Sequence, residues 1–286
     1  MNFFLDIFKY WSKDKIATLA AAFAYFTIFS LVPLLVICIA IAGLVLSKSA
    51  AEQQILSSLN SVIGSGGSQL VAQMINSQTH AYNSIIAAVI GMILVIIGAI
   101  GFYGQLLDGL NAIWEVQTKS GLGVWGVIRS RLFAFLAIIV MGIVFLLAII
   151  SSTLIGKFAH LLHSQLLVKT LHVIVSIGII TFIFILMYKF LPDVEINFGD
   201  VWLGALFSAI LFVISQVILG WYFSHASMKS QYGVAGSLIV IILWLYYLGQ
   251  IIFLGAEFIK VYVVKRGHQI QPSDKAAPIR LEKALK

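Results

Sequence analysis

The stretch SQYGVAGSLIVIILWLYYLGQIIFLGAEF, residues 230–258, decides the class of this protein. Its core at residues 238–256 carries no charge and is long enough as a helix to cross a bilayer core of roughly 30 Å, which takes about 20 apolar residues. Polar residues still recur along it at helical spacing: Tyr246, Tyr247, Gln250 and Glu257. Because an unpaired polar group in hydrocarbon is costly, this polar stripe is expected to face protein or a wet cavity. It is either a packing seam between helices or the wall of a polar path.

The composition excludes an ordinary soluble domain. Of the 286 residues, 61% are hydrophobic and 10% are charged, and the mean hydropathy is +1.04, whereas about a quarter of the residues of a soluble domain are charged. We therefore predict an all-α fold, a polytopic membrane protein with six transmembrane helices and short amphipathic interfacial helices. Residues 1–267 are expected to form a single membrane domain, with spans at about residues 17–46, 85–107, 132–155, 171–191, 201–223 and 237–259.

The N-terminal segment and the first span carry two local signals. Residues 1–16 place Phe3, Phe4, Ile7, Phe8 and Trp11 on one helical face, with lysines between them. This pattern predicts an amphipathic helix that lies on the membrane surface. In the first span, Pro33 is expected to kink or break the helix because proline cannot donate the backbone hydrogen bond. The lone cysteine, Cys38, excludes an intramolecular disulfide.

Two polar segments lie outside the expected spans. Residues 47–83 contain two apolar stripes, each too short to cross a membrane, with four residues between them at 64–67, three of which are glycines. This pattern predicts a helical hairpin that rests on the outer membrane face. Residues 268–286 form a basic, proline-containing tail that is expected to be cytoplasmic and disordered.

Basic residues are distributed unevenly over the expected topology. Six spans place both termini on one side of the membrane, and fourteen of the eighteen Lys and Arg residues fall on that side. Because positive residues concentrate on the cytoplasmic side, we predict a multi-pass protein of the bacterial inner membrane with both termini cytoplasmic. The same bias accounts for the net charge of +7 without any nucleic-acid partner.

The second expected span ends in a face of small and polar residues. Gly98, Gly101, Gly104, Gln105 and Asp108 fall within about a third of the helix circumference. We predict that this face meets the polar stripe of the last span across a lateral groove, because neither can face lipid. The candidate substrate path consists of Gln105, Asp108, Tyr246, Tyr247, Gln250 and Glu257. Just beyond, Asn111 and Trp114 are interpreted as a helix end and an interfacial anchor.

Four blocks of the chain resemble the YihY/BrkB family of bacterial inner-membrane proteins, once labelled ribonuclease BN. The blocks are AAFAYFTIFSLVPLL (21–35), GFYGQLLDGLNAIWEV (101–116), FLPDVEINFGDVWLGALF (190–207) and YGVAGSLIVIILWLYYLGQIIFLGAEF (232–258). In that family a basic residue often follows the asparagine of the second block, whereas this chain has Ala112. The resemblance implies a six-span inner-membrane protein without an established substrate or catalytic residues.

No enzymatic motif was found. The chain lacks GxSxG, HExxH and a phosphate-binding Walker loop, so we predict no catalytic residue, no metal and no cofactor. The acids Asp193, Glu195 and Asp200 are interpreted as a solvated turn rather than a metal site. His160 and His163 lie one turn apart in an expected outer segment; scattered surface histidines are favoured over a metal site, and recognition of anionic headgroups stays open.

These observations favour a protein that transports or handles an envelope molecule, with an anionic lipid or lipid-linked species as the preferred class. The alternative is an accessory membrane protein that binds or stabilises a partner without transporting anything. A ribonuclease is the third and least favoured hypothesis, because neither a basic groove nor a metal-activated water can be placed on such short loops.

Overall fold

The computed structural model describes residues 3–42, 47–81, 101–119, 165–225, 228–274 and 276–279. The helices in chain order are α1 (Phe3–Lys13), α2 (Ile16–Ala42), α3 (Lys48–Ala81), a helix at residues 101–113, α6 (Gln165–Phe190), α7 (Phe198–His225) and α8 (Met228–Lys265). Two short antiparallel strand pairs accompany them: β1 (Val116–Thr118) pairs with β4 (Ala276–Pro278), and β2 (Val194–Glu195) pairs with β3 (Gln271–Pro272). The fold is therefore mostly helical, as expected, with two small additions of strand.

Three of the described helices are long and apolar enough to cross a membrane. They contain the stretches Val173–Phe190, Phe198–Leu219 and Leu238–Lys265, which match the last three expected spans. The first expected span corresponds to α2, in which Ile16–Phe29 is a shorter apolar stretch. Only residues 101–107 of the second expected span are described, and the third, at residues 132–155, lies outside the described residues. The structure is thus consistent with a polytopic membrane protein, while the number of six spans stays a prediction.

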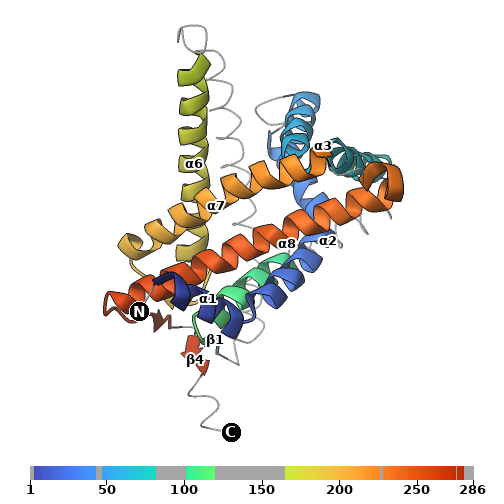
Figure 1. Cartoon of the computed structure of the whole chain (residues 1–286). Coiled ribbons are helices and arrows are strands. Elements are labelled where there is room, and N and C mark those ends of the chain that lie inside the picture. Colours follow the sequence, from blue (N-terminus) through green and yellow to red (C-terminus); the bar gives the residue numbers. More distant parts are fainter. Residues whose placement is uncertain are drawn as a thin grey trace.

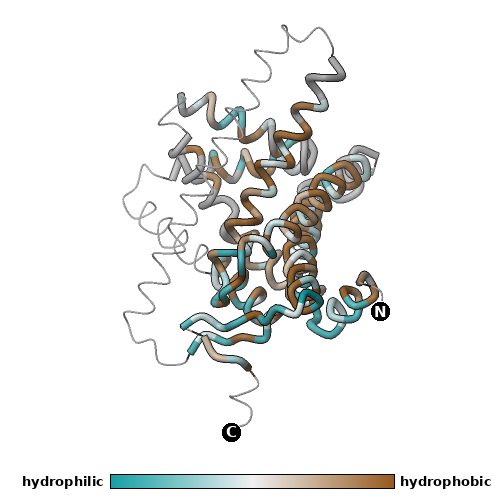
Figure 2. Tube along the Cα trace, turned by 90° about the vertical axis from the view of Figure 1, so that its left-hand side faces the viewer, coloured by the Kyte–Doolittle hydropathy of each residue, from teal (hydrophilic) through white to brown (hydrophobic). Residues whose placement is uncertain are grey.

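The outer faces of these helices suit lipid. Large apolar side chains stand exposed along α7, with Val217 68% and Ile218 59% accessible, and along α6, with Ile174 61% accessible. Such faces are rare on proteins surrounded by water. Hydrophilic residues instead gather at one end of the molecule, where the N-terminus and the short strands lie (Figure 2).

The long helix α8 is the centre of the packing. It contacts α1, α2, α3 and α7, and α7 in turn packs on α6 (Figure 1). Glycines allow α7 and α8 to approach closely. A Cβ atom at Gly204 would collide with Ile259, and one at Gly255 would collide with the side chains of Ser208 and Tyr188.

A buried tyrosine joins the three helices α6, α7 and α8. The Tyr188 hydroxyl lies 2.9 Å from the Ser208 hydroxyl and donates a hydrogen bond of 2.8 Å to the Ile252 carbonyl. Tyr188 is fully buried, so these bonds replace the water that its hydroxyl would otherwise bind.

Removal of this hydroxyl should weaken the junction measurably. Tyr188→Phe is expected to lower the free energy of unfolding by about 1–3 kcal/mol, because buried partners lose a hydrogen bond that nothing replaces. Unfolding of the purified protein in a titration with a denaturing detergent measures the loss. Tyr247→Phe is the control, since the Tyr247 side chain is 43% exposed. Equal stability of the two variants would contradict the proposed role of the hydroxyl.

Two expected interruptions of helices are only partly seen. The chain is helical through residues 64–67, so no loop separates the two halves of α3 at the glycines, although Ile55 of the first half and Val71 of the second lie in the same apolar cluster. Figure 1 shows its light-blue first half and teal second half running in different directions. Pro33 does not break α2, because a proline removes only one backbone donor and the rest of the helix remains bonded, and the other expected outcome, a kink, stays a prediction.

The expected disorder of the tail is wrong for residues 268–274 and 276–279. Strand β3 lies beside β2, and β4 lies beside β1, so the tail satisfies backbone groups of two distant loops. Ala276 is buried in the same apolar cluster as Val116 and Val194. The tail is polar in composition, but these pairings offset the entropy lost when it becomes ordered.

Candidate functional site

Helix α1 packs on α8 with the face that was expected to lie on the membrane. The ring of Phe3 contacts the ring of Phe258 edge-on at 5.0 Å between centroids, and Ile7 is buried. Beside them, Lys265 forms an ion pair of 2.8 Å with Asp6. The apolar face is therefore shared, because Phe3 and Ile7 pack on α8 whereas Phe8 stays 68% exposed, and the position of α1 at the membrane surface stays a prediction.

A chain of hydrogen bonds extends from α1 along the polar stripe of α8. The Trp11 indole Nε1 donates to Gln250 Oε1 at 2.9 Å, and Gln250 Nε2 donates to the Tyr246 hydroxyl at 2.8 Å. Since the Tyr246 hydroxyl accepts from Gln250, its own hydrogen and the second Gln250 N–H are available to a further acceptor.

The structure shows no direct bond between the polar stripe of α8 and its expected partner, the face with Gln105 and Asp108, among the described residues. Within the described part of the chain, neither Gln105 nor Asp108 hydrogen-bonds to α8, and the Asp108 side chain is exposed. The helix at residues 101–113 does pack on α8 beside the stripe, but through Gly109, whose missing side chain leaves room for the Phe253 ring. Tyr247 is 43% exposed and so does not share the protein-facing side. Whether any of these residues line a substrate path stays a prediction.

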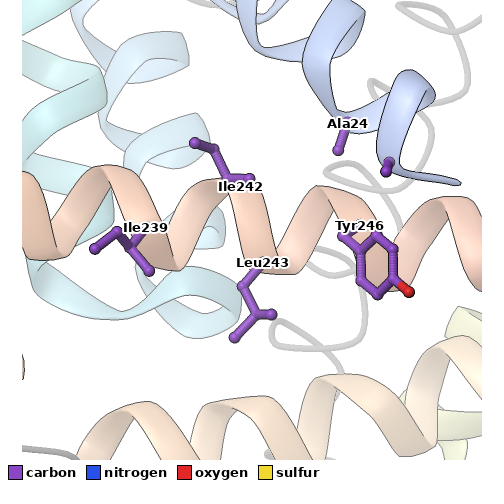
Figure 3. Close-up of a pocket in the computed structure, with 6 residues that line it drawn as sticks. Ala24, Ile239, Ile242, Leu243 and Tyr246 are labelled. Carbon is purple, nitrogen blue, oxygen red and sulfur yellow. The ribbon is translucent and has the colours of Figure 1, made fainter. Parts of the chain in front are cut away.

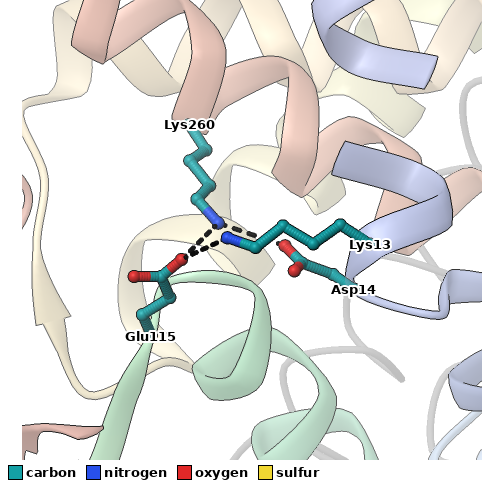
Figure 4. Close-up of polar contacts among 4 residues, drawn as sticks. All are labelled: Lys13, Asp14, Glu115 and Lys260. Atoms are coloured by element: carbon teal, nitrogen blue, oxygen red, sulfur yellow. Dashed lines mark hydrogen bonds and ion pairs between the residues drawn. The ribbon is translucent and has the colours of Figure 1, made fainter. Parts of the chain in front are cut away.

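Four charged residues form a cluster, hereafter the charge cluster, at one end of α8. Lys260 Nζ lies 3.1 Å from Asp14 Oδ2 and 3.6 Å from Glu115 Oε1, and Lys13 Nζ lies 3.1 Å from the same Glu115 oxygen (Figure 4). The cluster joins the turn between α1 and α2, the end of the helix at residues 101–113, and α8. The hydrogen bond to Glu115 raises the pKa of the exposed Lys13 above its ordinary value, with the charge of Asp14 adding to it.

Two residues in or next to the charge cluster have a strained backbone conformation. Lys15 (φ 51°) and Glu115 (φ 56°) are left-handed, a conformation that side chains other than glycine rarely adopt. Each costs of order 1 kcal/mol or more, which the surrounding contacts must offset. The ion pairs of Asp14 and Glu115 with Lys260 are contacts of this kind.

Glu257 lies one turn before Lys260 on α8 and is fully buried. Neither of its carboxylate oxygens has a hydrogen-bond partner among the described residues. The charged groups around it are Asp14, Lys260 and Lys13. The prediction that the Glu257 face avoids lipid is confirmed by this burial.

An apolar groove opens between α2 and α8 (Figure 3). Its volume is about 270 Å³, and its lining residues are Ala21, Ala24, Ile239, Ile242, Leu243 and Tyr246. Tyr246 is the only one of these lining residues with a polar side chain, so the hydrogen-bond chain from Trp11 reaches the groove at that residue.

Two of the three acids that were interpreted as a solvated turn, Asp193 and Asp200, are bonded to protein groups. Asn111 forms two hydrogen bonds with Asp193. The Asn111 Nδ2 donates to Asp193 Oδ2 at 3.1 Å, and the backbone N–H of Asp193 donates to Asn111 Oδ1 at 2.9 Å. The Thr118 hydroxyl donates to the same carboxylate at 2.7 Å. This interpretation was therefore wrong for Asp193, and Asn111 is a cross-link rather than a simple helix end.

Asp200 is buried in the first turn of α7, where the helix dipole stabilises a negative charge. It lies 3.5 Å from Arg266 Nη1 and 3.2 Å from His268 Nδ1. Trp114, expected at the membrane interface, is also buried in the core. Within the described ranges, no three His, Cys, Asp or Glu side chains come together as a metal-binding group. His160 and His163 lie outside those ranges.

The apolar spans, their exposed faces and the buried polar stripe define a polytopic helical membrane protein. The chain belongs to the BrkB family, whose model, described as "Virulence factor BrkB", matches residues 7–280. This confirms the resemblance that the four sequence blocks indicated, over nearly the whole chain.

The curated relatives of this chain are named as membrane proteins as well. The chain is 24% identical to a UPF0761 membrane protein of Alcanivorax borkumensis, over 98% of this chain and 64% of the relative. It is 25% identical to one of Acinetobacter baylyi, over 90% of this chain and 61% of the relative, and 24% identical to one of Psychrobacter sp., over 95% and 50%. The chain thus spans between half and just under two thirds of the length of these three relatives. No solved structure matches the chain.

Proposed function

We propose that this protein binds an envelope lipid, or a lipid-linked molecule, in the groove between α2 and α8 and transports or otherwise handles it. The observation that carries the proposal is the groove itself: an apolar wall that includes the Tyr246 hydroxyl, to which Gln250 is bonded. An amphiphile combines the same two chemistries, an acyl chain for the apolar wall and acceptor oxygens for the hydroxyl.

Positive charge near the groove favours an anionic headgroup. Trp11 binds Gln250, so α1 is attached beside the stripe, and Lys9, Lys13 and Lys15 are exposed on α1 and the turn that follows. Basic side chains at a membrane surface attract anionic lipids, at about 1 kcal/mol for each charge. An inner-membrane location with cytoplasmic termini completes the proposal and rests on the distribution of Lys and Arg.

Filling the groove should displace the lipid. Ala21 lines the groove with an exposed side chain, so Ala21→Trp is expected to fill it without a clash in the core. Mass spectrometry of the gently purified protein should then detect about tenfold less bound lipid, equivalent to about 1.4 kcal/mol of binding free energy.

The matched control is Ile214→Trp, which adds the same ring to an exposed position of α7 away from the groove. It should keep the lipid of the unmodified protein. Equal lipid on both variants would exclude the groove as the binding site, and absence of lipid from the unmodified protein would favour the accessory role.

A further inference from the structure

The buried carboxyl group of Glu257 does not line the groove that is proposed to bind lipid. Both of its oxygens lack a hydrogen-bond partner among the described residues, and the side chain is fully buried. An isolated buried charge is far more costly than a buried neutral group. Ionisable groups in such positions of membrane proteins are rare and mark functional sites by default.

No described residue forms an ion pair with Glu257. Lys260 is committed to Asp14 at 3.1 Å and Glu115 at 3.6 Å, and it forms no ion pair with Glu257. The Asp14 carboxyl group lies beside Glu257. An ionised carboxylate only accepts hydrogen bonds, so two ionised carboxylates cannot bond to each other, whereas one proton between them supplies the missing donor.

The surrounding charges are therefore arranged for a shared proton. Lys13 ends α1, Asp14 lies in the turn after it, Glu115 lies in the turn at residues 114–115, and α8 itself contributes Lys260. Tyr10 adds a ring 5.0 Å from Lys260 Nζ. The Asp14 side chain is 12% exposed, which gives the proton a route between Glu257 and water.

We propose that Glu257 is a proton-binding site that controls how the turn between α1 and α2 is held on α8. With the proton bound, Glu257 donates a hydrogen bond to Asp14, and Lys260 bridges Asp14 and Glu115. When the proton leaves through Asp14 to water, the new buried charge repels Asp14 and draws Lys260 away from both partners. The turn then loosens from α8. This inference does not depend on lipid binding.

Infrared spectroscopy of the full-length protein tests the protonation state. The unmodified protein should show the carbonyl stretching band of a protonated carboxylic acid at neutral pH, and the band should disappear when the pH is raised into the alkaline range. Glu257→Gln should remove the band, while Glu195→Gln, at an exposed acid, should keep it. The same band in all three proteins would overturn the proposal.

A second variant and a second measurement distinguish the loss of the proton-binding site from a folding defect of the Glu257→Gln variant. Asp14→Asn retains Glu257 but changes its acceptor, so the band should persist at a shifted frequency. Spin labels on cysteines at the exposed positions Lys9 and Val264, in a Cys38→Ser background, report the separation of α1 and α8. This distance should broaden at alkaline pH in the otherwise unmodified protein and stay constant with Glu257→Gln. A pH-independent distance in both would refute the control of α1.

Discussion

Gly255→Ala is expected to destabilise the protein strongly, although it adds a single carbon atom. A Cβ atom at this position would overlap the hydroxyl groups of both Ser208 and Tyr188. Overpacking of a tight core costs about 1–3 kcal/mol. Here the added atom also displaces the hydroxyl groups that bond α6 to α7 and α8, which adds about 1–3 kcal/mol for buried polar groups left unpaired.

The matched control is Gly178→Ala on α6, where an added Cβ meets no atom within 4 Å. Alanine is favoured over glycine in a helix by about 1 kcal/mol, so the control should be neutral or stabilising. Unfolding by a denaturing detergent, followed by the loss of helical signal, compares the two. If Gly255→Ala matched the control, the close approach of α7 and α8 at this point would be refuted.

Hydropathy was a reliable guide to the last three spans, because the signal is local. Twenty or so apolar residues must satisfy their own backbone as a helix in lipid, whatever the rest of the chain does. The same argument predicted that the face with Gln250 and Glu257 would avoid lipid, and both are at least partly buried.

The partner of that face could not be predicted in the same way. Helical periodicity identifies which residues share a side but not which of several neighbouring helices covers it. In the described structure α8 is contacted by four labelled helices, and α1 rather than the face with Gln105 and Asp108 provides the bond to Gln250. Gly109 was missed for the same reason, since its role depends on the Phe253 ring of a distant helix.

The structure of the polar segments was predicted from their composition alone, but it depends on contacts with residues far away in the chain. Asp193 is bonded by Asn111, which lies 82 residues away in the chain. Residues 271–272 and 276–278 form strands only because residues 194–195 and 116–118 offer free backbone groups. The sequence of a short polar stretch does not reveal that a distant strand will pair with it, so its composition predicted disorder.

The orientation in the membrane is the second prediction with a large effect. In the structure α3 and the tail lie toward opposite ends of α8: Ile55 and Val71 of α3 pack with Val240 and Ile241, whereas α1 binds at Gln250 and beyond. Fourteen of the eighteen basic residues fall on the side expected to hold the termini. The positive-inside rule therefore predicts an external α3 and a cytoplasmic tail.

Cysteine labelling decides between the two orientations without disturbing either segment. The protein has one cysteine, so a Cys38→Ser background carries no native thiol. Gln53→Cys on α3 and Gln269→Cys in the tail are both at exposed positions. In intact spheroplasts a membrane-impermeant maleimide should label Gln53→Cys fully, and Gln269→Cys only after lysis, because the bilayer blocks the charged reagent. The reverse pattern would place the termini outside, and labelling of both before lysis would put α3 and the tail on one side of the membrane.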